Sequence, residues 1–250
     1  NKVYKNGLGE FLFQNSLDPD KLAKFPFDKM VKPKSYSLPK SGRSLVGIGG
    51  GKDSIVSSEL LKASGEKITA FVVETQKPTD LVSDVVQELG LPVLKIKRIL
   101  DPQIFQKFEG SYNGHIPISA VYAFLGLLSA VFYKYDYVIT SNEFSSNFGN
   151  IEYKGMSINH QWSKSSHFEK LFQSYVRDSI TPSVIYFSLL RPYYEIKIVE
   201  MFSHHKKYFP YFSSCNQGFL ASRKRPDQLW CGHCPKCVFT FTMLSADLSK

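Results

Sequence analysis

Three adjacent glycines followed by a lysine, an aspartate and a serine form the strongest chemical signal in the sequence. The segment GIGGGKDS runs from Gly47 to Ser54. Glycine lets a backbone approach phosphate oxygens closely and turn its N–H groups toward them. A helix beginning near Ser54 would add the positive end of its dipole. We expect a phosphate-binding loop whose cofactor contacts come from Gly49, Gly50, Gly51, Lys52, Asp53 and Ser54.

Two better-known phosphate loops do not fit this segment. A Walker loop requires Gly-x4-Gly-Lys-Ser/Thr, whereas Asp53 stands between Lys52 and Ser54. A dinucleotide fingerprint requires a third glycine where Lys52 stands, counting from Gly47. An ordinary strand-to-helix turn does not need so specialised a sequence.

The four cysteines of the chain form a second signal, and all lie near its C-terminus: Cys215, Cys231, Cys234 and Cys237. Two successive C-x2-C steps let three thiolates converge on one ion, and Cys215 can complete a tetrahedron across a loop. We expect a closed, structural zinc site. An even number of cysteines also permits disulfides, and Cys215 in the polar string FSSCNQ can instead be a free, reactive thiol.

The elements that must position these groups alternate along the chain. The patterns predict strands at residues 44–48, 67–74, 93–98, 137–140 and 184–189, and helices at residues 54–63, 79–89, 118–133, 166–179 and 194–204. This alternation predicts an α/β fold with a parallel sheet of about five strands flanked by helices. Ligands of such sheets bind beyond the carboxyl ends of the strands.

The chain divides into three expected parts. Residues 1–43 are predicted to be an irregular N-terminal arm or linker, residues 44–205 an α/β domain that carries the phosphate-binding loop, and residues 206–250 a zinc-binding segment packed on it. Residues 141–165 form an unusually long polar connection, which is typical of a functional loop. Ser166 and Glu169 predict a capping box for the helix that follows.

Composition favours a soluble protein with an anionic ligand. The formal net charge is +9 and the hydrophobic content 43%, but lysine and arginine are scattered, so we expect no nucleic-acid partner. Residues 116–133 lack charges, yet their proline, glycine and serines favour a buried helix over a membrane span. No signal peptide is evident, and we expect a cytoplasmic location.

The glycine loop resembles the SGGxDS loop of the ATP-pyrophosphatase (PP-loop) superfamily, of adenine nucleotide α-hydrolase-like fold. Gly49 stands where that pattern has its first serine, so one hydroxyl donor is missing. The resemblance implies ATP and Mg²⁺ as cofactors, cleavage between the α- and β-phosphates, and Glu74 near the adenosine. The string CGHCPKC resembles the cysteine knuckle of 7-cyano-7-deazaguanine synthases. A ligase of that kind, a tRNA-modifying enzyme, or a nucleotide-binding module without catalysis are the alternatives.

Longer strings narrow the resemblance to one branch. NGHIPISAVYAFLGLL, SNEFSSNFGNIEYKG, NHQWSKS, YFSLLRPYYEIKI and WCGHCPKC resemble the MurL epimerases, with a likeness from about Gly47 to Val238. This implies that ATP adenylates the terminal L-Glu α-carboxylate of UDP-MurNAc-L-Ala-L-Glu, a peptidoglycan precursor. Adenylation removes the carboxylate's negative charge and so acidifies the α-proton, and reprotonation on the other face with hydrolysis gives D-Glu and AMP.

That chemistry requires proton-transfer groups and substrate contacts. The catalytic candidates are His115, His160, Cys215 and Lys52, although a lone histidine is more often structural. The candidate substrate contacts are Asn113, Asn142, Glu143, Asn147, Gln161 and Arg191. These polar groups can equally brace the long loop. Glu143 and Glu152 are candidate Mg²⁺ ligands, and Trp162 either stacks on a base or anchors the loop.

Overall fold

A five-stranded parallel sheet forms the centre of the computed structural model, which describes residues 1–26, 33–74, 80–106, 108–219 and 228–248. Its strand order is β3-β2-β1-β4-β7, and every pairing within it is parallel. The strands are β1 (Arg43–Gly47), β2 (Lys67–Glu74), β3 (Val93–Lys97), β4 (Tyr137–Thr140) and β7 (Ile185–Ser188). The expected α/β class with about five parallel strands is therefore confirmed.

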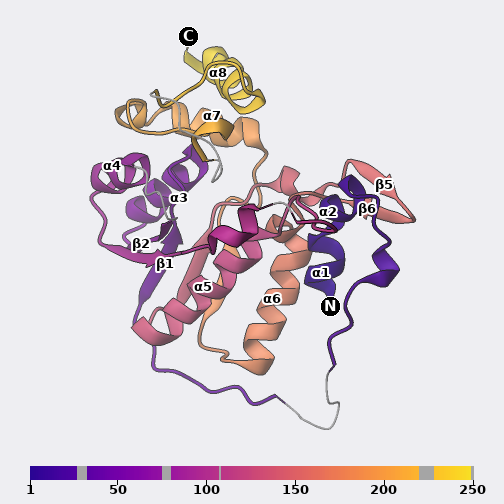
Figure 1. Cartoon of the computed structure of the whole chain (residues 1–250). Coiled ribbons are helices and arrows are strands. Elements are labelled where there is room, and N and C mark those ends of the chain that lie inside the picture. Colours follow the sequence, from indigo (N-terminus) through magenta and orange to yellow (C-terminus); the bar gives the residue numbers. More distant parts are fainter. Residues whose placement is uncertain (27–32, 75–79, 107, 220–227, 249–250) are drawn as a thin grey trace.

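Helices cover both faces of this sheet (Figure 1). The larger ones are α3 (Lys52–Ala63), α4 (Asp80–Leu89), α5 (Ile118–Tyr133), α6 (Ser166–Ser179), α7 (Glu195–Ser203) and α8 (Pro235–Leu248). Residues of α3, α4 and α7 share one buried cluster, and residues of α5 and α6 share the other. The helices that follow β1 and β2 thus cover one face of the sheet, and the helices before and after β4 cover the other face.

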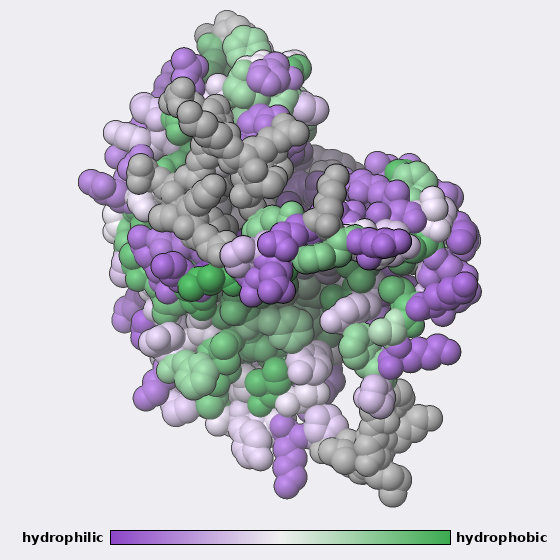
Figure 2. All heavy atoms as spheres, in the orientation of Figure 1, coloured by the Kyte–Doolittle hydropathy of each residue, from purple (hydrophilic) through white to green (hydrophobic). Residues whose placement is uncertain are grey.

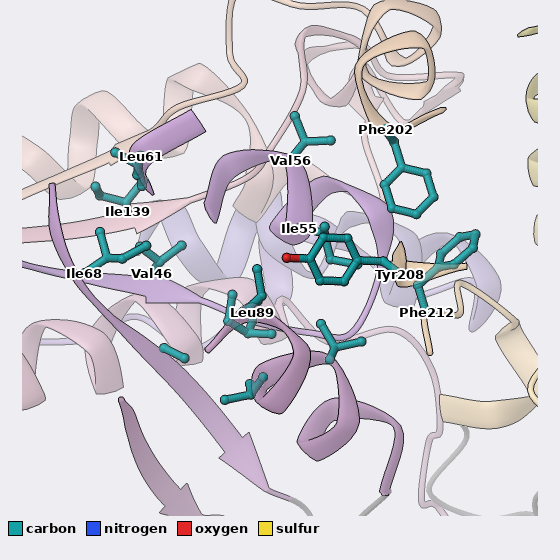
Figure 3. Packing of buried hydrophobic residues seen from close by; sticks show 14 of the residues in the cluster. Val46, Ile55, Val56, Leu61, Ile68, Leu89, Ile139, Phe202, Tyr208 and Phe212 are labelled. Carbon is teal, nitrogen blue, oxygen red and sulfur yellow. The ribbon is translucent and has the colours of Figure 1, made fainter. Parts of the chain in front are cut away.

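Alternation of side chains along the strands builds these two cores. Val46 of β1 enters the cluster with α3, whereas its neighbour Leu45 enters the cluster with α5, because successive residues of a strand point to opposite faces. Figure 3 shows the first cluster, in which Ile55 and Val56 of α3 meet Tyr208 and Phe202. Both large aromatic residues are fully buried, and the Tyr208 hydroxyl donates to Glu59 of α3.

The N-terminal segment differs from the expected irregular arm. It contains two short helices, α1 (Lys2–Gly7) and α2 (Gly9–Gln14). Gly7 lies against Pro117, where a Cβ would be 2.8 Å from the proline ring, and Gly9 lies against Ile158. Neither helix is long enough to be stable alone, so packing against the rest of the chain forms them. The expected division into three parts stays a prediction.

Two further elements were not anticipated. A hairpin of β5 (Ile151–Tyr153) and β6 (Met156–Ile158) folds within the long polar connection. Lys154 and Gly155 make its turn with φ of 46° and 73°, as a tight two-residue hairpin requires. The helix α8 follows the cysteines and begins at Pro235, a residue well suited to a first helical position.

The helix α5 is only half buried, which corrects the expected buried helix. Its Ala120, Ala123 and Leu127 lie in the core, but Phe124, Leu128 and Phe132 are exposed. Hydrophobic side chains gather in Figure 2 on the face where Figure 1 draws α5. Within the described residues, none of the helices combines the length and the apolar character needed to cross a bilayer.

Candidate functional site

The glycine loop lies at the carboxyl edge of the sheet, where the chain changes face. Gly47 ends β1 in the middle of the sheet, and β4 is its neighbour on one side. Residues that follow β1 and β4 therefore meet at one edge, which is where ligands of parallel sheets bind. Ser141, directly after β4, has a buried hydroxyl with no hydrogen-bond partner among the described residues. A buried hydroxyl in that state calls for a ligand or a water.

The loop has the geometry of an anion cradle. Gly50 adopts φ +83°, and a Cβ at this position would lie 2.3 Å from Cδ2 of Leu81, so only glycine fits without a rearrangement. Gly51 is the N-cap of α3 and brings no side-chain cap. The first N–H groups of α3 are therefore left for a ligand. The Ser54 hydroxyl donates to Gly51 O at 2.9 Å and holds the turn.

Lys52 is buried, and two carboxylates hold its ammonium group. Its Nζ lies 2.6 Å from Oδ1 of Asp53 and 3.0 Å from Oε1 of Glu195, and the residue is 3% exposed. Burial alone would lower the pKa of this ammonium, but the two carboxylates outweigh it, and the pKa is raised. Lys52 therefore stays charged beside the loop.

Arg191 stabilises the long polar connection, residues 141–165, through hydrogen bonds. Its Nη1 donates to Glu143 O and Ser146 Oγ, both at 2.9 Å, and its Nη2 donates to Lys164 O at 2.6 Å and to Glu169 Oε2 at 2.9 Å. The two Nη groups are thus committed to partners within the chain. The expected pairing of Arg191 with a substrate carboxylate stays a prediction, and bracing is the role that these contacts carry out.

The helix α6 is capped differently from the expected capping box. Ser165, not Ser166, is the N-cap, and its hydroxyl accepts from Phe168 N at 3.2 Å. Glu169 is used by Arg191 instead. The predicted N-cap was therefore wrong by one residue, and the predicted role of Glu169 in a capping box is replaced by an ion pair with an arginine that is distant in sequence.

Several other candidate residues also make contacts within the chain. The Asn147 amide donates to Phe144 O at 2.8 Å and accepts from Ser166 N at 2.7 Å. Asn142 Nδ2 donates to Thr140 Oγ1 at 3.1 Å, and the Glu143 carboxylate accepts from Ser145 Oγ at 3.1 Å. Gln161 begins the turn that carries Trp162, which is buried at 7% exposure. Trp162 therefore anchors the loop and does not offer its face to a base.

The two candidate histidines meet, although they are far apart in the sequence. The ring centroids of His115 and His160 lie 6.2 Å apart with an interplanar angle of 80°. Burial lowers the pKa of His115, against a raising contribution from Glu10. A neutral imidazole accepts a proton at neutral pH. Asn113 lies close by, with its carbonyl accepting from Asn15 Nδ2 at 3.1 Å.

Glu74 and Glu152 lie at the end of β2 and on the β5–β6 hairpin. Glu74 ends β2 and pairs with Lys95 Nζ at 2.9 Å. Glu152 is exposed on the hairpin, opposite Ser157. Nothing in these contacts tests the expected roles of Glu74 at the adenosine and of Glu152 at Mg²⁺, which stay predictions.

The four cysteines come together as the spacing predicts. The ligand atoms of Cys215, Cys231, Cys234 and Cys237 all lie within 4.8 Å of one another. Cys234 Sγ lies 3.4 Å and Cys231 Sγ 3.7 Å from Cys237 Sγ. A tetrahedral zinc ion with Zn–S bonds of ~2.3 Å separates its sulfurs by about 3.8 Å. The donor set and its spacing therefore fit such a metal.

The surroundings of the cluster favour the thiolate form at Cys234 but not at Cys237, where burial raises the pKa to about 12. Burial raises the pKa of Cys234, but hydrogen bonds from the backbone of Cys237 and Asn216 outweigh it and lower the pKa to about 6. His233 is not part of the cluster, because its Nδ1 lies 2.7 Å from Cys231 O at the surface.

Two residues that contact the glycine loop were not predicted from the sequence. Glu195 begins α7 and reaches Lys52, and Ser213 donates its N–H to Gly50 O at 3.1 Å. The only signal for Glu195 was its place just after the turn that follows the last strand. Ser213 lies within the polar string FSSCNQ, in which Cys215 carries the recognisable metal-ligand pattern and Ser213 carries none.

Comparison with known proteins gives a consistent result. The family model for the MurL N-terminal domain matches residues 1–189, and that for the MurL C-terminal domain matches residues 211–250. A curated relative from Xanthomonas oryzae pv. oryzae, named UDP-N-acetyl-alpha-D-muramoyl-L-alanyl-L-glutamate epimerase, is 38% identical over 250 residues, covering 99% of this chain and 54% of the relative. A relative of the same name from Salinispora tropica is 35% identical over 247 residues, covering 97% of this chain and 52% of the relative.

The chain spans about half the length of the curated relatives it matches. Among solved structures it is similar to NMN synthetase from Francisella tularensis, with 13% identity, a TM-score of 0.42, and coverage of 85% of this chain and 79% of that chain. Both MurL domain models match this chain, and curated relatives more than 30% identical align with nearly all of its residues. The chain therefore belongs to the MurL family.

Proposed function

We propose that this chain binds MgATP at the glycine loop and takes part in the ATP-dependent epimerisation of UDP-MurNAc-L-Ala-L-Glu. The observation that supports it best is the loop itself: Gly50 in a conformation that only glycine adopts readily, an uncapped helix start and a charged lysine. The names of the curated relatives supply the substrate, a nucleotide-sugar peptide whose terminal glutamate changes from L to D.

The proposed reaction uses each part of the site differently. The N–H groups at the start of α3, with Lys52, hold the β- and γ-phosphates while the glutamyl carboxylate takes up AMP and pyrophosphate leaves. Mg²⁺ prefers a carboxylate together with phosphates and waters. Asp53 pairs with Lys52 through Oδ1, and its second carboxylate oxygen, on a side chain that is 38% exposed, would be offered to the ion beside the loop. When bound, the ion neutralises the developing charge on pyrophosphate.

Proton transfer is assigned to the histidine pair. His115 with its lowered pKa is suited to take the α-proton of the adenylated glutamate, and His160 stands beside it. Cys215 is kept as a metal ligand and not as a base, because it is fully buried among the other cysteines. The metal would be structural, since four thiolates leave it no open position.

One assay tests the reaction. The purified chain is incubated with ATP, Mg²⁺ and UDP-MurNAc-L-Ala-L-Glu, and the glutamate is released and resolved by chiral chromatography. We expect D-Glu to form with one AMP and one pyrophosphate per turnover. AMP release without D-Glu would limit the chain to adenylation, and the absence of both AMP and nucleotide binding would contradict the proposal.

Metal analysis tests the second half. We expect about one zinc per chain, lost in Cys234→Ser, with a fall in stability because the metal contributes folding free energy. His233→Ala changes a neighbouring residue that is not a ligand and should retain the metal. A metal-free wild-type chain that is as stable with a chelator as without it would rule out the site.

A further inference from the structure

We propose that Ser213 couples the cysteine cluster to the glycine loop, so that a metal bound at the cluster strengthens phosphate binding at the loop, and phosphate binding strengthens metal binding. The inference rests on the proposed function for the identity of its two ligands. The coupling itself is derived from contacts of one buried serine, which is 2% exposed.

Ser213 and Ser214 form a wall against the glycine loop. The Ser213 N–H donates to Gly50 O at 3.1 Å. A Cβ at Gly51 would lie 3.3 Å from Ser214 Oγ and 3.7 Å from Ser213 O. The carbonyl and the N–H of one trans peptide point in opposite directions. Because Gly50 O is held toward Ser213, the N–H of Gly51 points away from Ser213 and is left for a phosphate.

The same serine fixes both chain segments that bring cysteines to the cluster. Its Oγ donates to Leu229 O at 2.7 Å and accepts from Cys215 N at 3.1 Å. Cys215 is one ligand of the cluster, and Leu229 lies two residues before the next, Cys231. The ring of Phe212 also packs on Trp230, with centroids 5.1 Å apart. Ser213 is therefore joined to the loop by its backbone and to the cluster by its side chain.

A metal that holds Cys215 and Cys231 at a fixed separation also fixes the position of Ser213 between them. That position sets the orientation of the Gly50 peptide. Without the metal, the two segments separate more easily and the loop loses its wall. Coupling between two binding sites is reciprocal in binding free energy, so the effect must be measurable from either site.

The test measures both affinities at equilibrium in the purified chain. Zinc affinity is determined by competition with a zinc-selective chelator, with and without Mg²⁺ and α,β-methylene-ATP, which resists cleavage. Affinity for that nucleotide is determined by calorimetry with and without zinc. We expect each ligand to raise the affinity for the other by the same factor, at least about fivefold.

Ser213→Ala removes the side-chain link and keeps the N–H that holds Gly50. We expect this variant to bind each ligand alone, with a coupling factor below about twofold, and Ser213→Thr, which keeps the hydroxyl, to retain the wild-type factor. Ser129→Ala is the matched control, because Ser129 is equally buried, at 2% exposure, and donates to Leu125 O on the distant helix α5. If Ser213 were only structural, Ser213→Ala would lower the affinities for zinc and for the nucleotide but leave the coupling factor unchanged.

Gly51→Ala tests the same link from the loop side, whatever the stability of Ser213→Ala. Its Cβ would lie 3.3 Å from Ser214 Oγ, a tight approach, and in ordinary contact with Ser213 O at 3.7 Å. A displacement of this segment should lower zinc affinity at the cluster although no ligand atom is altered. Independence of the two affinities in the wild-type chain, or an unchanged factor in Ser213→Ala, would overturn the coupling. A wild-type chain that binds no nucleotide at all would overturn the nucleotide site first, and the coupling with it.

Discussion

The ammonium of Lys52 lies 3.0 Å from the carboxylate of Glu195, the first residue of α7, which is distant in sequence from the glycine loop. Lys52→Ala removes the cation and leaves Asp53 and Glu195 to repel phosphate. Because a charge-assisted hydrogen bond contributes about 1.5–3 kcal/mol, we expect MgATP affinity to fall at least about tenfold, as measured by calorimetry.

The control for this change lies on the same helix. Lys62 pairs with Glu59 at 3.3 Å, away from the loop, and Lys62→Ala should leave MgATP affinity unchanged. Glu195→Gln keeps the shape of the side chain and removes one counter-charge, so its effect should be smaller than that of Lys52→Ala. Equal affinity in Lys52→Ala and the wild type would show that phosphates are held by the backbone alone.

A comparison of alanine variants at two glycines distinguishes backbone strain from a role in MgATP binding. Gly50 and Gly65 both have positive φ, of +83° and +77°, but a Cβ at Gly65 meets nothing within 4 Å, whereas one at Gly50 meets Leu81. Alanine at either position should cost about 1–3 kcal/mol of unfolding free energy, measured by urea denaturation. Only Gly50→Ala should also lose MgATP binding. Loss of binding in both variants would mean that strain alone accounts for it.

Arg191 offers a test of loop bracing. Arg191→Lys cannot reproduce the two Nη groups that reach Glu143, Lys164 and Glu169. We expect faster amide hydrogen exchange in residues 143–147 and a loss of about 1–3 kcal/mol of unfolding free energy. Arg177→Lys is the control, since its pair with Asp178 is exposed. Unchanged exchange in Arg191→Lys would favour the substrate-binding role expected from the sequence.

The lowered pKa of His115 predicts a pH dependence of stability. Burial holds the folded-state pKa of His115 below the unfolded value of about 6.5. At a pH between these two pKa values, the unfolded chain therefore binds more protons than the folded chain. The unfolding free energy of the wild type should therefore fall as the pH drops below about 6.5. His115→Asn should reduce this slope, measured by urea denaturation between pH 5 and 7. Superimposable slopes would contradict it.

The main sheet was predictable because its sequence patterns are local. β2 was expected at 67–74 and is observed at Lys67–Glu74, since an apolar run between turn residues needs no distant partner to be recognised. The helices α1 and α2 were missed because contacts with Pro117 and Ile158 stabilise them. The turn of the β5–β6 hairpin did carry a local signal, Lys154-Gly155 between alternating residues, which the polar character of the segment concealed.

The site was predictable to a similar extent. The cysteine cluster followed from spacing, because metal geometry limits which sulfurs can meet. The commitment of Arg191 to four acceptors did not, since it depends on where β7 and α6 lie in space. For the same reason the sequence did not predict the contacts of Glu195 and Ser213: their partners are Lys52 and Gly50, far away in the chain.

The central position of β1 also has a consequence for synthesis. One side of β1 pairs with β2, which follows it closely in the sequence. The other side pairs with β4, where the register partner of Leu45 is Val138. During translation, β1 therefore emerges long before this second partner exists, and one of its edges stays open. A nascent chain halted before residue 140 should be prone to aggregation, and release of β4 should end that exposure.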